Sequence, residues 1–216
     1  MTTAIVFDLD GTLADSSSCI VDAAHHVGQV LKRPPVQDED IEAKIGQPLD
    51  LLLSSLFDLE EASILHACQL YSAEYLRLAK SEEKLFEGAL PLVKALRKAE
   101  FKLAIATGKS QNGANNSTKR LGLSPWFDSI HGILPGTPGK PDPAVLVRAM
   151  EALNANPQDC IMVGDTVFDL ELAQKVGVKT AAVSWGVHSV EKLEQQNPDF
   201  LASSFSELHK WLMSHE

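Results

Sequence analysis

The sequence predicts an α/β protein with a Rossmann-like, doubly wound parallel sheet and a small all-helical domain inserted after the first strand. Three features support this prediction. Short apolar runs rich in β-forming residues recur along the chain, amphipathic stretches with helical spacing separate them, and one long segment near the N-terminus has helical spacing without a strand signal. Strands that alternate with helices form βαβ units, which place helices on both faces of a parallel sheet.

The expected strands are short apolar runs bounded by polar residues. The first run is followed by Asp10-Gly11, where a charged residue and a glycine break the strand. Apolar runs without polar alternation are typical of strands that are buried on both faces. The predicted strands cover residues 4–9, 103–106, 130–134, 161–163 and 181–183.

The segment that follows the first strand departs from the alternation of strands and helices. Two apolar stripes with helical spacing run through it, and Pro34-Pro35 ends the first, because proline disrupts a helix. Asp38-Glu39-Asp40 places acidic side chains where the start of another helix favours them. We expect a helical cap of residues 16–83 inserted into a core of residues 1–15 and 84–216. The stripes are Ile20, Ala24, Val27 and Leu31, and Ile64, Cys68, Tyr71, Tyr75 and Leu78.

The helices expected between the later strands have apolar residues three or four positions apart. Residues at this spacing lie on one face of a helix, and that face would cover the sheet. The sets are Leu92, Leu96 and Ala99; Val145, Ala149 and Leu153; and Leu170, Ala173 and Val176.

Composition and charge exclude several classes of partner. The chain has 216 residues, of which 44% are hydrophobic, enough for a sizeable core. Its formal net charge of −10 argues against nucleic acid and anionic membranes, since both require clustered basic residues. Cys19, Cys68 and Cys160 are widely spaced and are expected to be buried, reduced thiols. Because no signal-peptide core or long apolar run is visible, we expect a cytoplasmic protein.

Polar residues with complementary chemistry follow the first three strands. Asp8 and Asp10 lie at the end of the first strand, where carboxylates two residues apart can point the same way and bind a divalent cation. Gly11 would let backbone N–H groups approach an anion closely. Thr107-Gly108 offers a hydroxyl beside a flexible amide, and Lys140 precedes a helix from which it can reach an anion.

A second pair of acids follows the fourth strand. Asp165 lies at the strand end and Asp169 four residues later. In an open parallel sheet, ligands bind beyond the carboxyl ends of the strands. The four strand ends could therefore hold a metal ion, an anion and a nucleophile at one edge of the sheet.

In their order along the chain, these residues resemble the four motifs of the haloacid dehalogenase superfamily, and the helical segment resembles its small helical cap. The motif residues are Asp8-Leu9-Asp10-Gly11-Thr12, Thr107-Gly108, Lys140-Pro141 and Gly164-Asp165-Thr166 with Asp169. Within the superfamily the chain is similar to the phosphoglycolate-phosphatase-like branch. The residues that match this branch are Ile45-Gly46-Gln47-Pro48-Leu49, Ser184-Trp185-Gly186 and Pro198-Asp199-Phe200.

The resemblance implies a Mg²⁺-dependent phosphatase that hydrolyses phosphate monoesters of small metabolites. Asp8 would attack the phosphorus and form an aspartyl-phosphate. Asp10 would protonate the leaving alcohol and then activate water. Thr107 and Gly108 would hold the phosphoryl oxygens, and Lys140 would offset negative charge. Dehalogenases lack the second aspartate because halide needs no proton, so Asp10 favours phosphoryl transfer.

The resemblance also implies a metal site and a phosphate-binding loop. Asp169 would orient a metal-bound water or Lys140. Gly11 and Thr12 would belong to the phosphate-binding loop, with the Thr12 hydroxyl fixing the Asp10 loop. Lys109 is also close to a motif, but Lys140 in Gly139-Lys140-Pro141 is the better match. The implied metal ligands are Asp8, Asp10 through its backbone carbonyl, Asp165 and Asp169.

Two other functions remain as alternatives. A phosphomutase of the β-phosphoglucomutase type would share these motifs but return the phosphoryl group to a second hydroxyl, for which its cap would need cationic residues that hold a sugar bisphosphate. A receiver-type signalling domain also combines acids, a hydroxyl and a lysine on such a sheet. It is smaller, however, and its phosphorylated aspartate lies on a later strand.

The substrate is not apparent from the sequence beyond a small phosphorylated metabolite. In the resembling family, the cap covers the core and discriminates between substrates. We expect Gly46 and Gln47 to face the active site and to contribute to specificity. A monomer and a homodimer are both compatible with the sequence.

Overall fold

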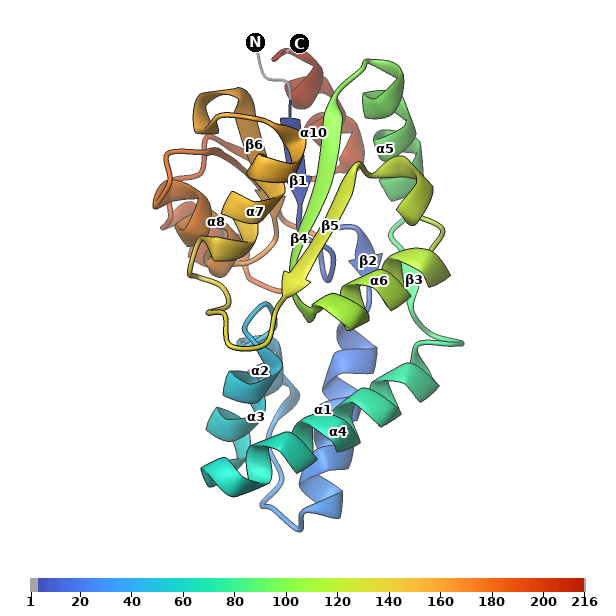
Figure 1. The fold of residues 1–216 in the computed structure, drawn as a ribbon, viewed down its shortest axis with the longest axis vertical. Coiled ribbons are helices and arrows are strands. Elements are labelled where there is room, and N and C mark those ends of the chain that lie inside the picture. Colours follow the sequence, from blue (N-terminus) through green and yellow to red (C-terminus); the bar gives the residue numbers. More distant parts are fainter. Residues whose placement is uncertain (1–3, 216) are drawn as a thin grey trace.

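The computed structural model describes residues 4–215 and contains a six-stranded parallel sheet flanked by helices (Figure 1). Its strands lie in the order β5-β4-β1-β6-β7-β8, so β1 is central. The α/β fold class predicted from the sequence is confirmed. The strands are β1 (Ala4–Phe7), β4 (Lys102–Ser110), β5 (Ser129–Ile133), β6 (Cys160–Gly164), β7 (Lys179–Val183) and β8 (Phe200–Ala202).

Both faces of the sheet are buried at its centre, which explains why β1 and β6 are continuous apolar runs. Side chains alternate along β1: Ile5 and Phe7 belong to one apolar cluster, and Ala4 and Val6 to another. Helices α5 (Ala89–Lys98) and α10 (Phe205–Met213) complete the first cluster. Helices α7 (Ala144–Leu153) and α8 (Val167–Gln174) complete the second.

Strand β1 ends at Phe7 rather than at the predicted residue 9, and the other predicted strands also differ in their bounds. Strand β4 continues past Thr107 to Ser110, and its register with β5 shifts between Ala106 and Ser110. Strand β8 was not predicted, because its apolar run of three residues is shorter than a typical strand and two of the three are only half-buried. The other elements of the core are α6 (Gln111–Arg120), α9 (Val190–Glu194) and the short 3₁₀ helices η1 (Ser124–Trp126) and η2 (Pro157–Asp159).

Four helices, α1 to α4, lie between the first strand and α5 in the chain and form a separate layer, which we call the helical insert. It lies beyond the carboxyl ends of the strands, at the end of the molecule opposite α10 (Figure 1). The predicted stripes hold it together, since residues such as Val27 and Tyr71 are buried in an apolar core of its own. The helices are α1 (Ser17–Val30), α2 (Asp38–Glu42), α3 (Leu49–Phe57) and α4 (Glu61–Leu78).

A two-stranded antiparallel ribbon joins the helical insert to the core. It consists of β2 (Ala14–Asp15) and β3 (Lys84–Leu85), and an ion pair of 3.3 Å links Lys84 Nζ to Asp15 Oδ2. The ribbon holds the two connections side by side. Strands of two residues carry no periodic signal, so the sequence did not predict them. The domain boundary between residues 83 and 84 stays a prediction.

Two further observations concern residues 4–215. No helix in this part of the chain combines the length and the apolar character needed to cross a membrane. The cysteines are free thiols, of which Cys19 and Cys160 are buried as expected, whereas Cys68 is only half-buried. The reason is that Cys68 lies at the margin of the core of the helical insert.

Candidate active site

Three buried carboxylates meet at the carboxyl edge of the sheet. The N–H of Asp8 donates to the carbonyl of Val163 at 2.8 Å, which extends the pairing of β1 with β6 and fixes the position of Asp8. Asp165 follows β6, and Asp169 lies in the first turn of α8. One oxygen from each of these carboxylates lies within 4.8 Å of the others. The cluster therefore brings Asp8 together with two carboxylates that are far from it in the chain.

Helix α8 holds Asp169 in one orientation. The Thr166 N–H donates to Asp169 Oδ2 at 3.1 Å, and the Thr166 side chain accepts from the Asp169 backbone, which completes a capping box. The Thr166 hydroxyl also lies 2.7 Å from the same oxygen of Asp169. The other oxygen of Asp169 accepts from Lys140 Nζ at 2.6 Å. Asp169 thus caps its helix and positions the lysine at the same time.

Lys140 links two of the carboxylates from the loop between β5 and α7. Its ammonium donates to Asp8 Oδ1 at 2.7 Å as well as to Asp169, and its side chain is fully buried. Burial alone would lower the pKa of Lys140, but the carboxylates of Asp169 and Asp8 raise it above the usual value. The lysine therefore stays charged. Because its ammonium contacts Oδ1 of Asp8, Oδ2 of Asp8 is free of this contact.

The loop after β1 supports Asp165. The Thr12 hydroxyl donates to Asp165 Oδ1 at 2.6 Å, and the N–H of Val187 donates to Oδ2 at 2.8 Å. Gly11 has a φ of +79°, and a Cβ at this position would lie 2.2 Å from Asp165 Oδ2. Only glycine fits this close approach. The Thr12 hydroxyl, expected to fix the Asp10 loop, joins this loop to Asp165.

The carboxylate of Asp10 is held outside this cluster. Its Oδ1 accepts from the Ser16 hydroxyl at 2.5 Å and lies 3.0 Å from Lys109 Nζ. The ammonium of Lys109 also lies 4.0 Å from the ring centroid of Tyr75 on α4, a cation–π contact with the helical insert. Asp10 and Lys109 therefore form a pair at the boundary between the two layers.

The sequence motifs favoured Lys140 over Lys109 as the functional lysine, and no role was predicted for Lys109. The signal that could have identified it is the spacing from Thr107, since residues two apart in a strand point to the same side. Both side chains line the same cavity in the structure. The extension of β4 beyond Thr107 is what brings Lys109 there.

The segment Gly46–Pro48 of the helical insert rests on the strand-end loops. A Cβ on Gly108 would lie 2.5 Å from the carbonyl oxygen of Gly46, and a Cβ on Gly139 would lie 2.1 Å from Pro48 Cγ. Glycine is therefore required at both positions for this close packing. Gly46 and Gln47 lie beside the cavity, as the sequence led us to expect of residues that face the active site.

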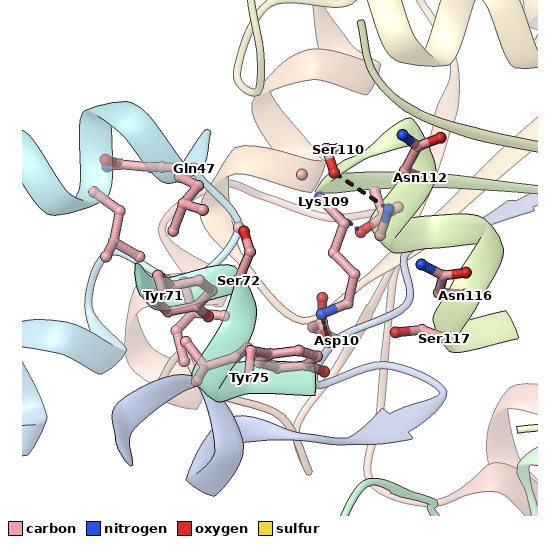
Figure 2. Close-up of a pocket in the computed structure, with 18 of the residues that line it drawn as sticks. Asp10, Gln47, Tyr71, Ser72, Tyr75, Lys109, Ser110, Asn112, Asn116 and Ser117 are labelled. Atoms are coloured by element: carbon pink, nitrogen blue, oxygen red, sulfur yellow. Dashed lines mark hydrogen bonds and ion pairs between the residues drawn. The ribbon is translucent and has the colours of Figure 1, made fainter. Parts of the chain in front are cut away.

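A cavity of about 360 Å³ lies between the helical insert and the core (Figure 2). Asp8, Asp10 and Thr107 border it on the side of the sheet. Figure 2 shows Tyr71 and Ser72 on one side, residues of α6 on the other, and Lys109 between them above Asp10. A substrate bound at the carboxylates would extend into this cavity.

The buried charges create a need for a cation. Burial raises the pKa of Asp8 well above its usual value, and Asp169 and Asp165 raise it further, although Lys140 opposes the shift. The pKa of Asp165 is raised to about 7, mainly by burial and then by Asp169, while hydrogen bonds from Thr12 and Val187 oppose the rise. One lysine cannot balance three carboxylates. An all-oxygen set of this kind fits a hard divalent cation such as Mg²⁺.

Comparison with known proteins points to one family. Residues 5–183 match the sequence model of a family described as haloacid dehalogenase-like hydrolase. A probable phosphatase, IndB of Dickeya dadantii, is 31% identical over 94% of this chain and 90% of that protein. Pyrophosphatase PpaX of Bacillus velezensis is 29% identical over 95% and 94% of the respective chains.

A solved structure shows the same similarity over nearly its whole length. The haloacid dehalogenase-like family hydrolase from Streptococcus pneumoniae has 31% sequence identity to this chain and a TM-score of 0.87. The alignment covers 98% of each chain, so it includes both the sheet and the helical insert.

Proposed function

Because this chain belongs to the haloacid dehalogenase-like hydrolases, we propose that it is a Mg²⁺-dependent phosphatase that uses Asp8 to take the phosphoryl group from a small phosphate monoester. The family membership confirms the resemblance seen in the sequence. The observation that carries the proposal is the contact of Lys140 with Asp8 and Asp169 beside Asp165, where Asp8 borders a cavity. This arrangement combines a nucleophile with the charges that a phosphate requires.

The carboxylates of Asp8, Asp165 and Asp169, with the backbone carbonyl of Asp10, would hold Mg²⁺, which when bound offsets negative charge on the phosphate. Lys140 contributes a second positive charge next to the nucleophile. Without such charges, a carboxylate and a phosphate dianion would repel each other. Thr12 and the N–H of Val187 hold Asp165 in place.

The reaction then needs one nucleophile and one acid–base group. Oδ2 of Asp8, the oxygen that Lys140 does not contact, attacks the phosphorus as the bond to the alcohol oxygen breaks. Asp10 gives its proton to that oxygen. Water then attacks the aspartyl-phosphate, Asp10 takes a proton from the water, and inorganic phosphate leaves. The Thr107 hydroxyl and the Gly108 N–H hold the phosphoryl oxygens during transfer.

The lining of the cavity favours a phosphatase over a phosphomutase. Among the described residues, the helical insert contributes no lysine or arginine to this lining, and a mutase would need such residues to hold a second phosphate. Transfer to water is therefore the simpler outcome. A mutase would require a bisphosphate primer for turnover, so assays with and without a sugar bisphosphate separate the two activities.

Phosphate release from a panel of phosphomonoesters in the presence of Mg²⁺ tests the proposal. We expect release with the wild-type chain, and rapid-quench mass spectrometry should find a phosphoryl adduct on the peptide that contains Asp8. Release without such an adduct would replace the covalent route with direct attack by water. Failure to release phosphate from any ester would reject the phosphatase assignment.

Lys109 serves as a positioning residue for Asp10, because its ammonium is 3.0 Å from the acid–base carboxylate. Lys109→Met is expected to lower kcat/KM for an alkyl phosphate by about 10- to 100-fold, part of the effect of general acid catalysis. With p-nitrophenyl phosphate, whose leaving group needs no proton, kcat/KM should change by less than about threefold, because kcat/KM reports the first phosphoryl transfer and not the later hydrolysis of the aspartyl-phosphate. Steady-state kinetics on the two esters provide the measurement.

Lys119→Met is the matched control, since Lys119 lies exposed on the neighbouring helix α6. It should leave both esters unaffected. An equal loss of kcat/KM on both esters in Lys109→Met would contradict a role through the acid function of Asp10. A rise in KM alone would instead indicate direct contact between Lys109 and the substrate.

A further inference from the structure

The cavity has two walls of different chemistry above the carboxylates. The wall from the helical insert is largely apolar: Ile20, Ile45, Leu49, Leu52, Tyr71 and Leu76. The wall from α6 carries uncharged polar side chains, Asn112 and Asn116 among them. Because the phosphoryl group binds at the floor, the leaving alcohol must lie between these walls.

The apolar wall contains a fixed aromatic surface. Tyr71 and Tyr75 are stacked, with ring centroids 6.0 Å apart and an angle of 16° between the rings. The Tyr75 hydroxyl donates to Glu83 Oε1 at 2.5 Å, which holds its ring in place. Burial raises the pKa of both tyrosines, so neither adds charge to the cavity. A surface held in this way favours a ring or a branched apolar group, because burial of apolar area stabilises the complex.

The charge of the cavity disfavours a second anion on the substrate. Lys109 is the cation among the described lining residues, and its ammonium already contacts Asp10 and the ring of Tyr75. Asp8 and Asp10 border the same space. A carboxylate on the leaving group would therefore approach other carboxylates without a free cation to offset it.

We propose that the substrate is the phosphate monoester of an uncharged alcohol that carries a ring or a branched apolar group. The ring lies against the wall formed by the helical insert, and amide side chains of α6 bind its polar substituents. This inference rests on the proposed function, because it takes the phosphate to lie at Asp8. It assigns selectivity to the helical insert through shape and hydrophobic contact rather than through ion pairs.

Three phosphonates with the same head group test the proposal by binding alone. Benzylphosphonate carries an uncharged ring, ethylphosphonate a small apolar group, and phosphonoacetate a carboxylate. Calorimetry with the wild-type chain and Mg²⁺ should give a Kd for benzylphosphonate at least about tenfold below that for ethylphosphonate. The Kd for phosphonoacetate should be at least about fivefold above that for ethylphosphonate. Tighter binding of phosphonoacetate than of ethylphosphonate would overturn the proposal and identify a receptor for an anion.

A matched pair of leucines on α4 localises the effect. Leu76 lines the cavity and is 42% exposed, whereas Leu65 is 70% exposed and lies outside the cavity lining, so both substitutions should be tolerated. Leu76→Asn is expected to weaken benzylphosphonate binding about fivefold and to leave ethylphosphonate unchanged. Leu65→Asn should alter neither. Equal effects of the two variants on benzylphosphonate would overturn the placement of the ring.

Binding and turnover separate this proposal from the function on which it rests. If benzylphosphonate binds most tightly but no ester yields phosphate, the phosphatase assignment fails and the selectivity of the cavity stands. If phosphate release depends on Asp8 but 2-phosphoglycolate is hydrolysed more efficiently than benzyl phosphate, the phosphatase assignment stands and the substrate class fails.

Discussion

Asp8→Asn is expected to lower phosphate release by about 10⁴-fold or more, because the amide has no nucleophilic oxygen to form the covalent adduct. The substitution keeps the size of the side chain and removes the charge that Lys140 contacts. Phosphate release from p-nitrophenyl phosphate and the mass of the quenched enzyme measure the two consequences. Both turnover and the phosphoryl adduct should disappear together.

The same variant should remain folded. The pKa of Asp8 is raised mainly by burial, which means that the fold disfavours its charged form, and asparagine removes this penalty. The melting temperature should therefore stay within about 4 °C of the wild type or rise. Asp22→Asn, at an exposed position on α1, is the matched control and should keep full activity. Release by Asp8→Asn within about tenfold of the wild type would rule out Asp8 as the nucleophile.

The sheet and much of the site follow from patterns that are local in the sequence. Strands β1 and β6 are buried on both faces and read as apolar runs, so their ends are visible where polar residues begin. All strands in the sheet are parallel, which brings the residues after β1 and β6 to the same edge. The meeting of Asp8 and Asp165 could therefore be predicted without knowledge of any side-chain contact.

Contacts that depend on how two layers pack could not be predicted in this way. The pair between Asp10 and Lys109 requires β4 to continue beyond Thr107, and the ring of Tyr75 comes from a helix of the other layer. The hydrogen bond from Thr12 to Asp165 also joins separate loops. These contacts are set by the tertiary arrangement rather than by periodicity or spacing, and they decide what surrounds the motif residues.

Removal of divalent cations is expected to abolish turnover. Without Mg²⁺, a phosphate would approach three carboxylates offset by Lys140 alone, and this repulsion corresponds to a loss of about a thousandfold or more in rate. Assays with EDTA should show no release above background, and an excess of Mg²⁺ should restore it. Ca²⁺ should restore little, because it does not impose octahedral geometry. Full activity in EDTA would contradict a role for the metal.

Metal binding should also appear as a pH-dependent gain in stability that does not rely on turnover. Since the pKa of Asp165 is raised from 3.8 to about 7, the metal-free folded state binds more protons than the unfolded chain between these values. Its free energy of unfolding therefore falls as the pH rises through this window, and the unfavourable carboxylate charge is fully present above it.

Bound Mg²⁺ offsets that charge, so the melting temperature at pH 8 should rise by about 5–10 °C at about a hundredfold excess of Mg²⁺ over its Kd. At pH 5, protons compete for the same oxygens and the gain should be smaller. In Asp165→Asn, the rise in melting temperature that Mg²⁺ causes at pH 8 should shrink to the rise seen at pH 5. An unchanged rise in this variant would place the cation elsewhere.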